Sequence, residues 1–100
     1  MVMNIEVKKN SGEVIIEVAG RLDTITAPTL EKAIGENIND IKNLILDLKE
    51  LNYISSAGLR VLLSTHKKMQ NIGSMKVRNA CVEIMEIFEM TGFVDILSIE

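Results

Sequence analysis

The sequence has few residues of several kinds, and each shortage excludes a class of protein. Its one cysteine, Cys81, excludes an internal disulfide, and together with the one histidine, His66, it is too little for a Cys/His metal cluster. We therefore expect no metal and no cofactor on this chain. Basic residues are not in excess, because the formal net charge is −3, and so no binding to nucleic acid is expected.

Long apolar segments are also missing. The longest apolar runs have the length of a strand, whereas a helix that spans a membrane needs roughly 20 such residues. The N-terminus lacks a basic segment followed by an apolar one, which is the pattern of an export signal. We therefore expect a cytoplasmic protein that does not insert into a membrane.

What is present is the composition of an ordinary globular domain. Hydrophobic residues make up 47% of the chain and charged residues 25%, which suits one core with a solvated surface. No linker, repeat or low-complexity segment divides the sequence. A single domain covering residues 1–100 is expected.

The first part of the chain predicts a hairpin and a helix. The runs 3–9 and 14–19 are rich in β-branched residues, and the segment between them contains Gly12, so we expect two antiparallel strands. The helix that follows is expected to have Thr26 as its N-cap and Pro28 in its first turn. Its helical spacing is set by Leu30, Ile34, Ile38 and Ile41.

The rest of the chain alternates strands with helices. The patterns predict strands at 43–48, 74–79 and 94–99 and helices at 57–71 and 80–90, the last helix capped by Asn79 and ended by Gly92. The expected order is β-β-α-β-α-β-α-β. This alternation indicates an α/β fold with a mainly parallel mixed sheet, to which the N-terminal hairpin adds one antiparallel pair.

Functional residues of such sheets collect at the carboxyl ends of the strands. Two loops lie there in the predicted order, 20–28 and 49–58. If the strands before them are parallel neighbours, one edge of the sheet carries Asp23, Thr24, Ser55 and Ser56.

A serine at the start of a helix has two physical interpretations. The hydroxyl of Ser55 or Ser56 can cap the helix by accepting a backbone hydrogen bond, and for such a serine taken alone this is the commoner role. The same position suits a phosphate, because unpaired backbone N–H groups and the positive end of the helix dipole stabilise negative charge. Local chemistry alone favours the cap and tolerates the phosphate.

Three segments of the chain carry a resemblance to a known family. They are GRLDTITAPTLEKAI from residue 20, LILDLKELNYISSAGLRVLL from residue 44 and GSMKVRNACVEIMEIFEMTGFVDIL from residue 73. With them the chain resembles bacterial anti-sigma factor antagonists, which are small single STAS domains. The most specific positions are Gly20, Leu22, Asp23, Asp47, Leu48, Leu51, Ser56, Gly58, Leu59 and the MTGF of residues 90–93.

The resemblance implies a regulatory binding protein and not an enzyme. In that family the unphosphorylated antagonist binds an anti-sigma factor and so frees a sigma factor for transcription. The anti-sigma factor is also a serine kinase, which inactivates the antagonist by phosphorylating one serine, and the family's motif places that serine at Ser56. A metal-dependent serine phosphatase reverses the modification, so ATP and Mg²⁺ belong to the partners.

The chain departs from the commonest form of the family at one position. Many members have aspartate where this chain has Ser55, so Ser55 stays open as an alternative acceptor. The resemblance implies that Asp23 helps to present the serine to the kinase, although bracing of its own loop accounts for it equally well. Arg60, one turn beyond Ser56, is expected either to pair with a phosphate there or to stay solvated.

The expected partner surface is formed by the 20–28 loop and by residues 53–62. Within it, Tyr53 and Ile54 are expected either to contact the partner or to pack beneath the loop. The full predicted set is Asp23, Thr24, Tyr53, Ile54, Ser55, Ser56, Gly58 and Arg60.

Two other functions stay open at the level of sequence. A STAS domain can be an interaction subunit of a lipid-transport or stress-sensing complex, without any phosphorylation. An enzyme with Ser56 as its nucleophile would need a base, and His66 lies ten residues further along the same helix, about 15 Å away along its axis. This distance argues against the hypothesis of an enzyme.

Overall fold

The first two strands form the hairpin that the sequence predicts. In a computed structural model, which describes residues 3–100, β1 (Asn4–Asn10) pairs antiparallel with β2 (Glu13–Leu22) along its whole length. Gly12 closes the turn between them with a φ of 74°, a left-handed conformation that glycine adopts without steric cost. The hairpin thereby places β2 inside the sheet and β1 at its edge.

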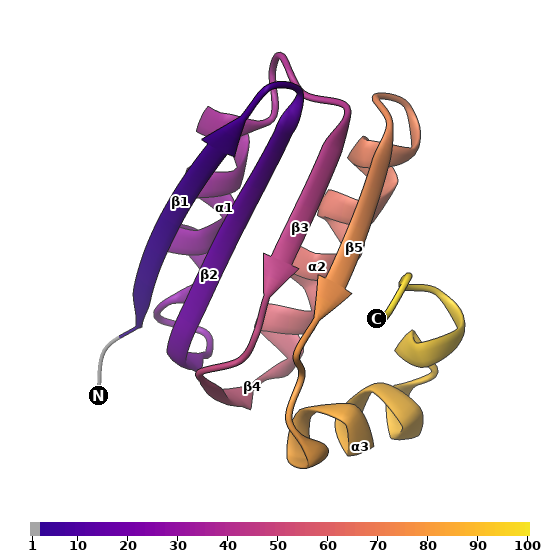
Figure 1. Ribbon diagram of the computed structural model, residues 1–100. Coiled ribbons are helices and arrows are strands. Elements are labelled where there is room, and N and C mark those ends of the chain that lie inside the picture. Colours follow the sequence, from indigo (N-terminus) through magenta and orange to yellow (C-terminus); the bar gives the residue numbers. More distant parts are fainter. Residues whose placement is uncertain (1–2) are drawn as a thin grey trace.

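The sheet continues with strands parallel to β2. Its order is β1-β2-β3-β5, in which β3 (Asn43–Asp47) and β5 (Ser74–Arg78) each run parallel to their neighbour. The helices α1 (Ala27–Asn37) and α2 (Ser56–Gln70) lie against the same face of the sheet, behind it in Figure 1. The predicted α/β fold with a mainly parallel mixed sheet is confirmed.

The core lies between the sheet and these helices. Every second residue of β2 is buried, so the strand presents one apolar face to the helices and the other to solvent. The strand contributions include Val14, Ile16, Val18, Leu22, Leu44, Leu46, Met75 and Val77, and the contributions of α1 and α2 include Leu30, Ile34, Leu62 and Met69. Ile84 and Phe88, from the later helix at 82–91, join the same core. Within residues 3–100 no helix has both the length and the apolar character needed to cross a bilayer.

The sequence analysis missed one strand, β4 (Leu51–Ile54). This strand lies inside the segment 49–58 that was expected to be a loop, and it pairs in parallel with the last residues of β2. The backbone N–H of Gly20 donates to the carbonyl of Glu50 at 2.9 Å. The parallel partner of β2 is β3 up to Glu17 and β4 from Gly20 onward. Gly20 has a φ of 95°, which a residue with a side chain rarely adopts.

Asn79 does not cap the third helix, contrary to expectation. The helix α3 (Val82–Thr91) begins later, with Cys81 at its N-cap position, and packs against β4. Asn79 instead has a φ of 62°, and its side-chain amide donates to Asp47 at 3.2 Å. A left-handed backbone here turns the chain away from β5 before the helix starts.

Asp47 joins the ends of β3 and β5. Its carboxylate is almost fully buried, accepts a hydrogen bond from the backbone N–H of Lys49 at 3.0 Å, and pairs with the guanidinium of Arg78 at 3.4 Å. Burial raises the pKa of this carboxyl, but the hydrogen bonds from Lys49, Asn79 and Arg78 outweigh it, so the pKa is lowered overall. Asp47 therefore fixes the turn that leads into β4.

The last predicted strand, 94–99, is reduced to a single bridge. Gly92 ends α3 in a left-handed conformation as expected, and a 3-10 turn, Phe93–Asp95, follows it. Only Ile99 then pairs with β5, opposite Val77. The tight turn uses residues that a strand would need, so little chain is left to pair with β5.

Gly58 provides a test of the packing between α2 and the strands. A Cβ at this position would lie 2.7 Å from Cγ of Leu22 and 2.8 Å from Cγ1 of Ile54, both of which are buried. We expect Gly58→Ala to lower the free energy of unfolding by about 1–3 kcal/mol, as overpacked cores do. Urea denaturation measures the change.

Gly35→Ala is the matched control. Gly35 lies in α1, where nothing lies within 4 Å of the position of an added Cβ. This substitution should raise the free energy of unfolding by up to about 1 kcal/mol, because alanine favours a helix over glycine. Equal effects of the two substitutions would contradict the close approach at Gly58.

Candidate functional site

The two loops singled out by the sequence meet at one edge of the sheet. Because β2 and β4 are parallel and paired, with Leu22 opposite Ile54, both strands end at the same place. The backbone N–H of Ser55 donates to the carbonyl of Leu22 at 2.9 Å, which extends the pairing beyond the strands. The expectation that Asp23, Thr24, Ser55 and Ser56 share this edge is confirmed.

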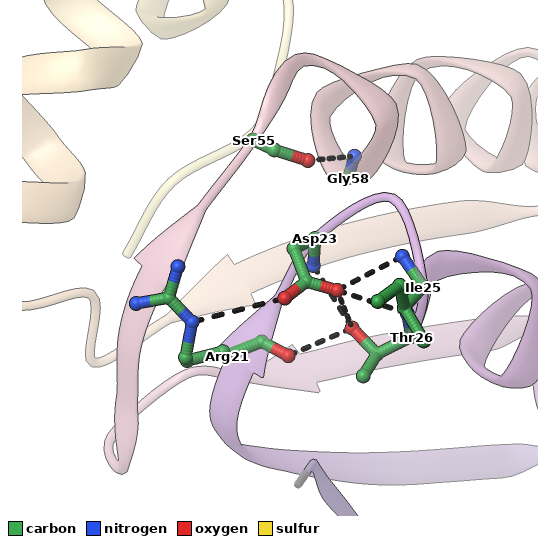
Figure 2. Close-up of polar contacts among 6 residues, drawn as sticks. All are labelled: Arg21, Asp23, Ile25, Thr26, Ser55 and Gly58. Carbon is green, nitrogen blue, oxygen red and sulfur yellow. Dashed lines mark hydrogen bonds and ion pairs between the residues drawn. The ribbon is translucent and has the colours of Figure 1, made fainter. Parts of the chain in front are cut away.

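The two serines have different positions in the structure. Ser55 is the N-cap of α2, has an extended backbone, and its hydroxyl oxygen accepts a hydrogen bond from the backbone N–H of Gly58 at 3.4 Å (Figure 2). Ser56 is the first residue of the helix and is exposed. Capping and exposure are therefore divided between neighbouring residues, and the hydroxyl of Ser56 is accessible beside the helix N-terminus.

Asp23 braces its own loop. One carboxylate oxygen accepts hydrogen bonds from the backbone N–H groups of Ile25 and Thr26, both at 3.0 Å (Figure 2). The bond from Thr26 is the main reason why the pKa of Asp23 lies below its usual range; the bond from Ile25 and the charge of Arg21 add to it, and partial burial opposes it. Of the two roles considered for Asp23, bracing has direct geometric support.

Thr26 holds the N-cap position of α1, but its side chain does not cap the helix. Its hydroxyl accepts a hydrogen bond from the backbone N–H of Asp23 at 2.9 Å and donates to the carbonyl of Arg21 at 2.8 Å. The hydroxyl thus points back into the loop. The carboxylate of Asp23 takes over the helix start by accepting from the backbone N–H of Thr26.

A shallow groove of about 430 Å³ lies between α1 and α2, and it is lined by Ala57, the neighbour of Ser56 in the chain. Its two charged residues, Glu31 and Arg60, come from opposite helices. The other lining residues are small or apolar with hydroxyl groups among them: Thr24, Ala27, Pro28, Ala57, Val61 and Ser64. Thr24 and Arg60, both predicted to bind a partner, are exposed and face this groove.

Two predicted partner-binding residues are buried. Ile54 is 3% exposed and lies in the core, and Gly58 is buried where the helix approaches the ends of β2 and β4. Neither offers a surface to a partner, so they shape the site from beneath. Tyr53, the neighbour of Ile54, is 38% exposed and does lie at the surface.

The sequence analysis overlooked Arg21 and Ile25. The guanidinium of Arg21 lies over the ring of Tyr53, 4.1 Å from its centroid, and its Nε is 3.7 Å from the carboxylate of Asp23. Ile25 is 85% exposed at the tip of the 23–26 loop. An apolar residue among polar ones in a loop was a signal for Ile25, but nothing in the sequence could pair Arg21 with Tyr53 before β4 was known.

Within residues 3–100, no cluster of three or more His, Cys, Asp or Glu side chains could hold a metal ion. His66 lines a small cavity with Gly73, Ser74 and Ser98, towards the opposite end of α2 from Ser56. His66 is therefore not placed to act as a base for Ser56.

The sequence matches a known family over nearly its whole length. The STAS domain model matches residues 4–100. Among curated proteins, the anti-sigma-B factor antagonist of Bacillus subtilis (strain 168) is 31% identical over 100 residues, which cover 99% of this chain and 92% of that protein. The similarity thus includes both loops of the site.

Solved structures give the same result for the fold. A crystal structure of an anti-sigma factor antagonist from Mycobacterium paratuberculosis superposes with a TM-score of 0.89 and 26% identity, covering 98% of this chain and 85% of that one. The Bacillus cell fate determinant SpoIIAA in its phosphorylated form gives 0.76 and 16% identity, covering 97% and 91%. The second likeness concerns the fold alone.

The acid sensitivity of the fold tests the role of Asp23. A carboxyl group with a lower pKa in the folded than in the unfolded protein stabilises the fold above its unfolded pKa, and this contribution is lost as the pH falls through the folded pKa. Because the pKa of Asp23 is lowered from 3.8, the wild type should lose stability on acidification below this value. Urea denaturation at a series of pH values measures the loss.

Asp23→Asn is the matched variant, since its amide oxygen can still accept the two backbone hydrogen bonds but cannot ionise. Its stability should fall less than that of the wild type over the same pH interval. The remaining fall includes the contribution of Asp47, whose pKa is also lowered. Parallel curves for the two proteins would show that Asp23 does not carry the assigned role.

Proposed function

The chain belongs to the STAS domain family, and from this we propose that it is an anti-sigma factor antagonist switched off by phosphorylation of Ser56. Unphosphorylated, it binds an anti-sigma factor and so releases a sigma factor. The anti-sigma factor is the kinase, and a serine phosphatase restores the active form. ATP and Mg²⁺ act on those partners, and the protein works in the cytoplasm.

The observation that carries the proposal is the division of roles between the two serines. Ser55 supplies the capping oxygen, while Ser56 presents an exposed hydroxyl at the first position of a 15-residue helix. A phosphate on Ser56 would lie at the positive end of the helix dipole, where backbone N–H groups lack intrahelical partners. Modification is therefore compatible with the fold, and Ser56 is the acceptor in preference to Ser55.

The relatives support the binding role. Curated relatives at about 30% identity over nearly the whole chain, from Bacillus subtilis and Listeria monocytogenes, are anti-sigma-B factor antagonists. The family is one of regulatory binding proteins. A binding role agrees with the position of His66, which lies ten residues beyond Ser56 in α2 and so is too far away to act as its base. We therefore assign no catalytic activity to this chain.

The proposed mechanism is electrostatic and steric. The surface around Ser56 comprises the exposed residues Thr24, Tyr53 and Arg60 together with the groove between α1 and α2. A phosphate adds a charge of about −1.5 to −2 and three strong acceptors to this surface. A partner surface that fits a neutral hydroxyl cannot accommodate that charge without a large desolvation cost, so the complex dissociates.

Phosphorylation itself is the first test. The protein is incubated with the anti-sigma kinase of the same genome and ATP, and intact-mass and fragment spectra locate the phosphate. We expect one phosphate on Ser56, none on Ser56→Ala, and an undiminished reaction with Ser55→Ala. Phosphate on Ser55 would overturn the choice of acceptor, and an unmodified wild type would overturn the switch.

The charge at position 56 is the second test. Ser56→Asp should weaken binding to the anti-sigma factor at least about tenfold, or roughly 1.4 kcal/mol. Asparagine has nearly the same shape as aspartate but no charge. Ser56→Asn should therefore bind within about threefold of the wild type. Calorimetry measures both affinities, and equal losses for the two variants would contradict an electrostatic mechanism.

A further inference from the structure

We propose that Arg21 is a positioning residue, which holds the 23–26 loop and β4 together in the arrangement that the anti-sigma kinase recognises. This inference rests on the proposed function for its partner. The side chain of Arg21 contacts Tyr53 and Asp23 and not Ser56 itself. Its effect is transmitted through Tyr53 and Asp23.

The first contact of Arg21 is with β4. Arg21 and Tyr53 are opposite one another in the pairing of β2 with β4. The guanidinium carbon lies 4.1 Å from the centroid of the Tyr53 ring, within the range of a cation–π interaction. Tyr53 precedes Ser55 by two residues in the chain, so this contact fixes the strand that leads directly to the serines.

The second group of contacts is with the 23–26 loop. The Nε of Arg21 lies 3.7 Å from the carboxylate of Asp23, whose other oxygen holds the backbone of that loop (Figure 2). The carbonyl of Arg21 accepts the hydroxyl of Thr26 at 2.8 Å. One residue thus touches both segments that form the proposed partner surface.

The backbone is irregular at this point. The pairing of β2 with β4 comprises only three residue pairs, and its register shifts between Gly20 and Arg21. Gly20 also has a left-handed φ of 95°. A pairing this short, with a shift in register, holds β4 weakly against β2. The contact between Arg21 and Tyr53 joins the two strands at this point.

These contacts are too exposed to decide whether the protein folds. The side chain of Arg21 is 43% exposed, and exposed ion pairs and cation–π contacts stabilise a fold only slightly. The same contacts affect binding more than stability. A surface whose loops are already ordered binds more tightly, because less conformational entropy is lost when the partner binds. Loss of Arg21 should weaken recognition while the fold remains.

The experiment measures phosphorylation kinetics of Arg21→Ala and Tyr53→Leu by the anti-sigma kinase. We expect KM to rise about fivefold in each, as for the loss of one modest contact, with kcat unchanged because the hydroxyl of Ser56 is untouched. Arg21→Lys should recover part of the loss and Tyr53→Phe nearly all of it, since each conserves the cation or the ring. A fall in kcat at constant KM would overturn the proposal.

Two comparisons separate positioning from direct contact. If Arg21 acts through Tyr53 and Asp23, the double variant should be no worse than Arg21→Ala alone. Multiplied effects would mean that both side chains touch the partner independently. Lys8→Ala is the charge control, because Lys8 also forms an exposed ion pair, with Glu17 at 3.1 Å, in the same sheet. If Lys8→Ala raised KM as much as Arg21→Ala, the effect of Arg21 would come from its net charge alone.

Amide hydrogen exchange of the free protein provides a readout that does not need the kinase. Arg21→Ala and Tyr53→Leu should speed exchange in residues 23–26 and 51–56, and Lys8→Ala should not. Unchanged exchange there would overturn the positioning role even if Ser56 is phosphorylated. If exchange is faster in these variants but the kinase does not phosphorylate the wild type, the structural role of Arg21 stands and the proposed function is wrong.

Discussion

The exchange of neighbours along β2 is the constraint on which the rest of the structure depends. The strand pairs with β3 over its first half and with β4 over its last residues, and a left-handed Gly20 marks the change. Since β4 is parallel to β2, both strands deliver their loops to the same edge, and the bond from Ser55 to Leu22 fixes their spacing. Without this pairing the two loops would be separate parts of the surface.

At that edge, neighbouring residues divide structural and surface roles. Ser55 caps α2 while Ser56 is exposed, Ile54 fills the core while Tyr53 lies at the surface, and Leu22 is buried beside an Asp23 that organises the loop above it. The capping bond of Ser55 and the buried contacts of Ile54 and Leu22 do not involve the exposed hydroxyl of Ser56. This separation is compatible with the proposed switch, which alters a binding surface without refolding the domain.

Much of the fold was predictable because its signals are local. Hydrophobic spacing located α1, α2, the hairpin and the strands of the main sheet, and Gly92 ended α3 as expected. The failures occurred where the signal was short or depended on a distant partner. The four residues of β4 acquire their identity only from β2, and Asn79 serves Asp47 on another strand and not the helix beside it. At the site, Arg21 was missed for the same reason, since its partner Tyr53 is 32 positions away.

The sequence by itself determined the class of fold, the family and the pair of serines, because periodicity, turn residues and motifs are encoded within short stretches of chain. It left open which serine caps the helix, whether Asp23 braces its loop, and which predicted contact residues are accessible. Tertiary structure decided these points, since burial and hydrogen-bond partners depend on which segments the fold brings together. Ile54 and Tyr53 are adjacent in the chain, and only the packing of β4 against the core places one inside and the other at the surface.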